Sequence, residues 1–102
     1  MAETVFAWTV PGDHPAFAGH FPGNPIVPGV VLLDRAILCA EQLLGQPVAH
    51  WQVGNAKFLS PVGPGETLHF TLEQKASGAI AFTARAGDGR CIASGSLTPP
   101  AP

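Results

Sequence analysis

The sequence predicts an α+β domain in which a curved antiparallel sheet wraps around one long central helix. Two observations lead to this fold class. A run of good helix formers spans residues 29–44 and has a proline-rich segment before it, and everything after Pro47 alternates apolar and polar residues with a period near two. One early strand, one apolar helix and four successive strands favour an antiparallel sheet packed on the helix.

The first strand is expected at Thr4–Val10, whose alternating residues give one strongly apolar face. From residue 11 to residue 28, five prolines remove backbone donors and restrict the residues before them. Neither a helix nor a central strand can continue through such a segment. We therefore expect a long ordered loop, and loops of this length are often functional.

The helix is expected at Gly29–Leu44, after Pro28 and before Gly45 and Pro47. At 100° per residue its polar side chains fall on one arc, while apolar side chains cover most of the remaining surface. Such a helix should be largely enclosed by the rest of the protein. Asp34 lies at the edge of the polar arc, so the periodicity does not by itself bury it.

The second half of the chain predicts four strands separated by turns. Residues 60–65 and the Asp88-Gly89 pair have turn composition. The chain then forms one domain, residues 1–102, in which residues 98–102 are expected to be a frayed tail. The four expected strands are Val48–Phe58, Glu66–Lys75, Ala79–Ala86 and Arg90–Leu97.

The composition restricts the class of protein. With 46% hydrophobic and 12% charged residues, much of the surface must be weakly polar or covered by another chain, so we expect an oligomer. Five Lys and Arg residues against seven Asp and Glu, without a basic run, exclude the charge pattern of a nucleic-acid binder. Cys39 and Cys91 are expected to be reduced thiols, because the chain is too poor in cysteine for a disulfide scaffold.

The N-terminal residues lack the basic region and the long apolar region of a signal peptide. No run reaches the roughly 18 apolar residues that would suggest a membrane span. We therefore expect a soluble, cytoplasmic protein without a membrane partner.

The segment GHFPGNPIVPGVVLLD, residues 19–34, places His20 and Asp34 fourteen positions apart. An imidazole titrates near neutral pH and can act as a general base. Asp34 can act as the complementary acid if apolar surroundings keep it protonated. The amides of Gly29 and Val30 lie at the helix N-terminus, where a developing oxyanion is stabilised. Together these groups suit β-elimination of water next to a carbonyl, without a cofactor.

Each of these residues also has a structural explanation. A histidine in a loop is more often a structural hydrogen-bonding group than a catalyst. The polar residues near Asp34 on the helix are typical of a solvated helix face. His14 and Asp13 near His20 match no strong ligand spacing, so no metal is expected. Cys39, within an apolar helix, is expected to belong to the core and not to act as a nucleophile.

The same segment resembles the signature of the 3-hydroxyacyl-[acyl-carrier-protein] dehydratases, hot-dog-fold enzymes of fatty-acid synthesis. The similarity extends to KFLSPVGPGETLHF, residues 57–70, and in order and spacing covers most of residues 10–97. The resemblance implies a hot-dog fold and dehydration of 3-hydroxyacyl chains carried on the phosphopantetheine arm of an acyl carrier protein. It also implies that His20 is the catalytic histidine, Asp34 the catalytic acid and the Gly29 amide the donor to the thioester carbonyl.

In this family the smallest unit is a dimer, and each site takes its histidine and its acid from different subunits. We therefore expect a homodimer in which the Val48–Phe58 strand or its neighbour extends the sheet across the interface. Asp34 is expected to point inward, toward His20 of the partner subunit, and Arg35 to point to solvent or to the carrier.

The sequence also departs from the family pattern. Asp34 stands where the commoner branch has Glu, Leu38 where a Gln is usual, and Arg35 where a small residue is usual. The chain resembles a compact accessory dehydratase of a specialised lipid or polyene pathway more than the housekeeping enzyme. Arg35, Lys57, Arg85 and Arg90 are the candidate docking cations for an acidic carrier protein.

Two other functions remain open at this point. A hot-dog thioesterase would need a positioned water and a base on another stretch, for which the sequence has no signature. A catalytically silent acyl-binding or assembly subunit is suggested by the departures at Leu38 and Arg35.

Overall fold

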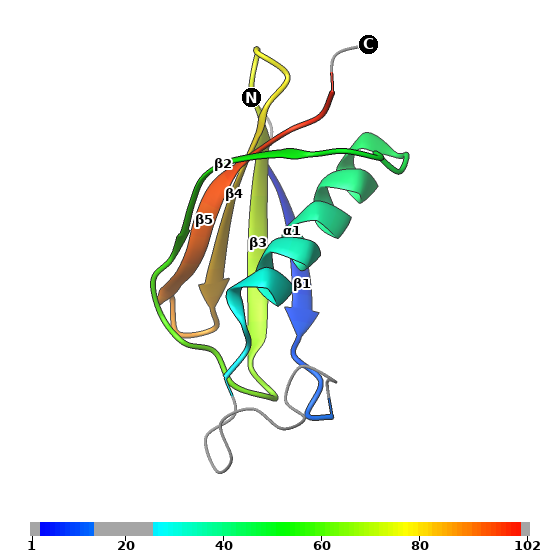
Figure 1. The fold of residues 1–102 in the computed structure, drawn as a ribbon. Coiled ribbons are helices and arrows are strands. Elements are labelled where there is room, and N and C mark those ends of the chain that lie inside the picture. Colours follow the sequence, from blue (N-terminus) through cyan, green and yellow to red (C-terminus); the bar gives the residue numbers. More distant parts are fainter. Residues whose placement is uncertain (1–2, 14–25, 101–102) are drawn as a thin grey trace.

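The computed structural model describes residues 3–13 and 26–100, which form one sheet with a helix lying across one face (Figure 1). All strand pairs are antiparallel, and the order β1-β3-β4-β5-β2 leaves β1 and β2 at the two edges. This confirms the α+β prediction. The elements in chain order are β1 Glu3–Thr9, α1 Gly29–Leu44, β2 Gln52–Phe58, β3 Thr67–Gln74, β4 Ile80–Ala86 and β5 Cys91–Thr98.

Most expected strand ends differ from the observed ones by at most one residue, and two differences matter for the assignment. The strand expected from Val48 begins only at Gln52, because the Val48 N–H donates to Oε2 of Glu41 at 3.0 Å and so turns away from a strand ladder. Thr98, expected in the frayed tail, is the last residue of β5 and pairs with Gln52.

The bounds of α1 match the expectation, and the flanking residues explain them. Pro28 precedes the helix in an extended conformation, with φ −62° and ψ 148°, and no side chain caps this end. Gly45 ends the helix with φ 78°, a left-handed conformation that glycine adopts without steric cost, and its N–H donates to the Glu41 carbonyl at 2.9 Å.

The core lies between α1 and the inner face of the sheet. Alternate residues of β3 and β4 point toward the helix, as the period-two pattern predicts, and their neighbours point to the outer face. The main buried side chains are Leu32, Ala36, Cys39 and Ala40 of α1, Leu68, Phe70 and Leu72 of β3, Ile80, Phe82 and Ala84 of β4, and Ile92 and Leu97 of β5. No helix in the described part of the chain is long and apolar enough to cross a membrane.

The expectation that α1 is largely enclosed is wrong for a single chain. A sheet can cover only one side of a helix that lies across it. The opposite side of α1 exposes Val30 at 63% and Leu38 at 49%, with the exposed Asp34 between them. These residues are spaced four apart and therefore share one face of the helix. The edge strand β2 adds the half-exposed Phe58 and, just after it, Leu59.

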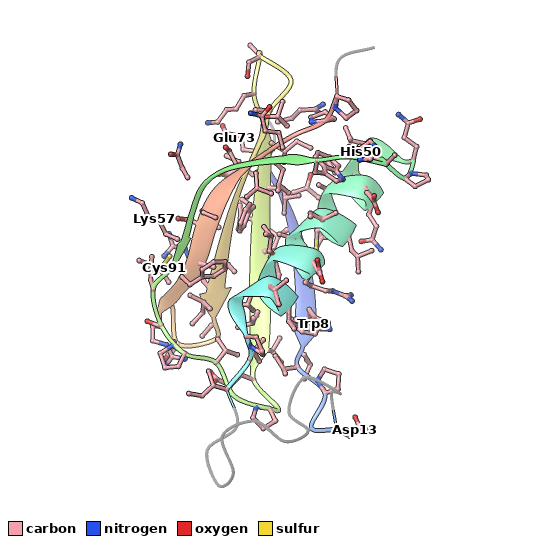
Figure 2. All side chains as sticks on the ribbon, viewed as in Figure 1. Trp8, Asp13, His50, Lys57, Glu73 and Cys91 are labelled. Atoms are coloured by element: carbon pink, nitrogen blue, oxygen red, sulfur yellow. The ribbon has the colours of Figure 1, made fainter. Side chains whose placement is uncertain are left out.

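Arg35 does not point to solvent as expected. Its guanidinium carbon lies 5.2 Å from the centroid of the Trp8 ring, so this α1 side chain packs against β1. Trp8 is labelled in Figure 2. A guanidinium over an indole face is attracted by the ring quadrupole, and its apolar stem can cover the neighbouring surface. The Nε atom of Arg35 is buried and has no hydrogen-bond partner among the described residues.

The two cysteines are free and differ in environment. Cys39 is buried in the core and Cys91 is partly exposed at the start of β5. Burial raises the pKa of the Cys39 thiol, and the positive charge of Arg35 offsets only part of this rise. Cys39 therefore stays a neutral core thiol, in agreement with the expectation from the sequence.

We predict that replacing Arg35 by Ala lowers the free energy of unfolding by about 1 kcal/mol, because both the contact with Trp8 and the packing of the stem are lost. Urea unfolding measures the change. The matched control is Arg85→Ala, which removes an exposed cation from β4 and should change the unfolding free energy by less than about 0.5 kcal/mol. Equal effects of the two substitutions would contradict the packing role of Arg35.

We also predict that iodoacetamide at pH 8 labels Cys91 of the folded protein, while Cys39 reacts only after unfolding. Mass spectrometry of the peptides measures both rates. Cys91→Ser should remove the reaction of the folded protein, and Cys39→Ser should leave it. Labelling of both thiols at similar rates would show that Cys39 is not held in a closed core.

Candidate active site at the N-terminus of the helix

The N-terminus of α1 opens onto a hollow of about 250 Å³. Its lining is mostly apolar and comes from the start of α1 and from the segment that follows β2. Among the described residues, the N–H groups of Gly29 and Val30 have no hydrogen-bond acceptor, and Pro28 offers no capping side chain. These two amides are therefore free to donate to a ligand. The lining residues are Ile26, Val27, Gly29, Leu32, Phe58, Leu59, Ser60 and Pro61.

Gly29 allows the Phe58 ring to lie against the first turn of the helix. A Cβ atom at Gly29 would lie 3.2 Å from three carbons of that ring, closer than most carbon atoms approach. The ring has room to move only outward, since Phe58 is half exposed. A larger residue at position 29 would thus reshape the hollow and cover its amides.

Asp34 lies one turn beyond the free amides, on the open side of α1. Within the described residues no hydrogen bond or ion pair reaches its carboxylate, and Arg35 points away from it toward Trp8. The expectation that these two neighbouring side chains diverge is confirmed. Asp34 is flanked along the helix by the exposed side chains of Val30 and Leu38. A second surface laid on this side of α1 would therefore bring apolar groups around the carboxyl.

His20 belongs to residues 14–25, which lie outside the described residues. Its role and its pairing with Asp34 stay predictions. The residues on both sides of this segment are held by the turn that follows β2: the Val27 N–H donates to the Val62 carbonyl at 2.8 Å, and Val10 exchanges hydrogen bonds with Gly65 and Glu66. The sequence analysis identified this turn by composition but not its contacts.

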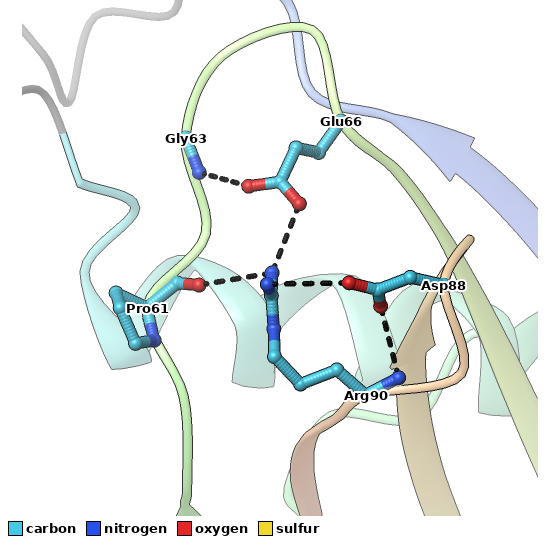
Figure 3. A network of polar contacts seen from close by, with 5 residues as sticks. All are labelled: Pro61, Gly63, Glu66, Asp88 and Arg90. Carbon is cyan, nitrogen blue, oxygen red and sulfur yellow. Dashed lines mark hydrogen bonds and ion pairs between the residues drawn. The ribbon is translucent and has the colours of Figure 1, made fainter.

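Arg90, predicted as a docking cation, is engaged within the chain. Its guanidinium lies 3.0 Å from Glu66 and 3.5 Å from Asp88, and it also donates to the Pro61 carbonyl at 3.4 Å (Figure 3). The sequence analysis did not predict this cluster. Its residues do stand out in the sequence, since Glu66 ends the PVGPGE segment and Asp88 and Arg90 flank Gly89 in a turn.

The two other predicted docking cations lie away from the hollow. Arg85 is exposed on β4 between two buried neighbours and so points to the outer face of the sheet. Lys57 pairs in register with Ser94 and lies on the β2 side of the sheet, away from α1 (Figure 2). The four candidates therefore do not form one patch in a single chain, and their docking role stays a prediction.

The other titratable side chains of the described residues do not form a candidate metal site. In residues 3–13 and 26–100, no three His, Cys, Asp or Glu side chains are grouped as metal ligands would be. His50, just before β2, and His69, on β3, are both exposed.

Comparison with known proteins places this chain in a family. The model of the ApeI-like family, described as ApeI dehydratase, matches residues 1–96. Among curated proteins, the 3-hydroxyacyl-[acyl-carrier-protein] dehydratase FabZ of Rhizobium rhizogenes is 38% identical over 79 residues, covering 70% of this chain and 50% of that protein. The FabZ of Thermomicrobium roseum is 34% identical over 92 residues, covering 83% and 60%. The chain thus spans about half the length of the curated relatives it matches.

Solved structures show the same fold. An uncharacterized protein from Erwinia carotovora subsp. atroseptica aligns with a TM-score of 0.77 at 32% identity, covering 94% of this chain and 81% of that one. The dehydratase heterocomplex ApeI:P from Xenorhabdus doucetiae gives 0.77 at 23% identity, with 94% and 85% covered. The (R)-hydratase from A. caviae involved in PHA biosynthesis gives 0.68 at 15% identity, with 97% and 95% covered. Taken with the match over residues 1–96, these likenesses show that the chain has a hot-dog fold and belongs to the ApeI-like dehydratase family.

Proposed function

We propose that this protein removes water from 3-hydroxyacyl thioesters to give trans-2-enoyl thioesters, with His20 as general base and Asp34 as general acid. The observation that supports this most is the position of Asp34. It is exposed on the open side of α1, one turn beyond two free backbone amides, and apolar residues flank it. Membership of a dehydratase family and the names of the curated relatives support the same reaction class.

The groups suffice for the reaction without a redox step. His20 accepts the proton from C2 of the substrate, and the electron pair left on C2 forms the C2–C3 double bond. The C–O bond at C3 breaks, and Asp34 delivers a proton so that the hydroxyl leaves as water. Negative charge that develops on the thioester oxygen is stabilised by the Gly29 amide, whose N–H has no other acceptor among the described residues.

We further propose that a second copy of the chain completes the site. The open side of α1 and the edge strand β2 expose Val30, Leu38 and Phe58, which a dimer would cover. Covering this side would also desolvate Asp34, as a general acid requires. Loss of water around the carboxyl, and not a change in the helix itself, is the expected effect of assembly.

The acyl group is proposed to arrive on an acyl carrier protein, because the curated relatives are named for that substrate. Lys57 and Arg85 are the exposed cations left for docking, since Arg35 packs on Trp8 and Arg90 is bound by carboxylates. Charge reversal at Lys57 and Arg85 is therefore the informative docking variant.

We predict that His20→Ala and Asp34→Asn each reduce turnover by at least ~10²-fold, because loss of a general acid or base typically has this effect. Turnover is measured with 3-hydroxyacyl thioesters of several chain lengths, on carrier protein and on coenzyme A. Melting temperature and sedimentation serve as controls, and both variants should keep the wild-type values. An inactive wild-type chain that folds and dimerises would favour an acyl-binding subunit, and release of free acid in place of enoyl product would favour a thioesterase.

We also predict that Gly29→Val lowers turnover by about 10²-fold, because it displaces Phe58 and shifts the substrate carbonyl from the amides, and a misplacement of about 1 Å can have this effect. The melting temperature should hardly change, since the hollow is open. The matched control is Gly87→Val, where a Cβ atom has no neighbour within 4 Å and turnover should persist. Full activity of Gly29→Val would remove the first turn of α1 from the site.

A further inference from the structure

The guanidinium of Arg90 links the β4–β5 turn to the 61–66 turn at the end of the sheet where α1 begins (Figure 3). Its Nη2 atom donates to Oε1 of Glu66 at 3.0 Å and to the Pro61 carbonyl at 3.4 Å. The turn between β4 and β5 orients the residue, because the Arg90 N–H donates to Oδ1 of Asp88 at 3.0 Å and Nη1 lies 3.5 Å from Oδ2 of the same carboxylate. Arg90 is thus held on its own hairpin and reaches across to the 61–66 turn.

Glu66 transmits this contact to the backbone of the turn. One carboxylate oxygen accepts from Arg90, and the other accepts from the Gly63 N–H at 2.8 Å. Pro61 and Pro64 have no N–H groups, and of the remaining backbone donors of the turn the Gly63 N–H is bound by a side chain, that of Glu66. The side-chain contacts of Arg90 and Glu66 therefore act together with the backbone hydrogen bonds that tie the turn to Val10 and Val27.

The 61–66 turn also forms one wall of the hollow at the N-terminus of α1. Pro61 lines that hollow directly. The next residue, Val62, accepts a hydrogen bond from Val27, two residues before the helix begins, and Gly65 donates to the Val10 carbonyl at 2.8 Å. A shift of the turn would therefore move both the wall of the hollow and the backbone that leads into Gly29.

The cluster has little importance for global stability. The side chains of Arg90 and Glu66 are 41% and 38% exposed, and ion pairs this accessible to solvent add little to the free energy of folding. Its effect is therefore expected to be local, on the geometry of the turn and of the residues bonded to it.

We propose that Arg90 and Glu66 are positioning residues for the site at the N-terminus of α1, and that they act by fixing the 61–66 turn. This role rests on the function proposed above. This role replaces the docking role that the sequence suggested for Arg90: its charge is used within the chain, to place backbone atoms, and not to attract a partner.

The first test is amide hydrogen exchange of the full chain, followed by NMR. In Arg90→Met, the Val27 and Gly65 amides should exchange at least about tenfold faster than in the wild type, because the turn that protects them opens more often. Core amides of β3 and β4 should be unchanged, and so should the melting temperature. Wild-type protection of Val27 and Gly65 would overturn the proposal, whatever the activity of the protein.

Matched variants test whether faster exchange in Arg90→Met could result merely from the loss of a charge or of any exposed ion pair. Lys75→Met removes an exposed pair with Glu73 at the opposite end of the sheet and should leave Val27 and Gly65 protected. Arg90→Lys keeps the charge but presents one nitrogen in place of the planar fork, so its exchange should resemble that of Arg90→Met. Full protection in Arg90→Lys would show that charge suffices and would contradict positioning by the fork.

The second test is turnover of a coenzyme A thioester, a substrate without a carrier protein to dock. Arg90→Met and Glu66→Gln should each lower kcat by about tenfold with KM unchanged, and the double variant should lose no more than the single ones, because both act through the same turn. Additive losses, or a loss confined to carrier-bound substrate and abolished by salt, would assign Arg90 to docking. If the wild type itself has no dehydratase activity, the proposed function fails and hydrogen exchange alone decides the positioning role.

Discussion

The structure depends most on one geometric constraint: a single sheet can cover only one side of the helix that lies across it. In this chain the covered side of α1 holds Leu32, Ala36 and Cys39 in the core, and the open side exposes Val30, Asp34 and Leu38. In an isolated monomer the open side would favour aggregation, because its exposed apolar side chains lie near the unpaired edge strand β2. It also presents Asp34, the carboxyl proposed above as the general acid. In the proposed function, assembly and chemistry therefore use the same surface.

The N-terminus of α1 shows how backbone geometry supplies the rest of the site. Pro28 starts the helix without a capping side chain, and within residues 3–13 and 26–100 the Gly29 and Val30 N–H groups have no acceptor. Gly29 lets the Phe58 ring close one side of the hollow, and the 61–66 turn closes another. The hydrogen bond from Val27 to Val62 connects that turn to the helix. The free amides, the Phe58 ring and the 61–66 turn meet at one end of α1, and together they shape the candidate site.

Much of this could be predicted from the sequence because the signals were local. The helix bounds follow from Pro28 and Gly45, and the buried faces of β3 and β4 follow from the period of two. The contacts that were missed join residues far apart in the chain. Arg35 meets Trp8 only because β1 lies beside β3 under the helix, and Arg90 meets Glu66 across 24 positions. A helical wheel also cannot show that the apolar side of α1 exceeds what one sheet covers.

The central claim is that each site combines His20 of one subunit with Asp34 of the other, and one measurement tests it directly. His20→Ala and Asp34→Asn chains with different tags are produced together, and the mixed dimers are purified through both tags. A mixed dimer has one site with both substitutions and one with neither, so it should recover about half of the wild-type turnover while each parent dimer stays inactive. A mixed dimer as inactive as its parents would contradict a site shared between subunits.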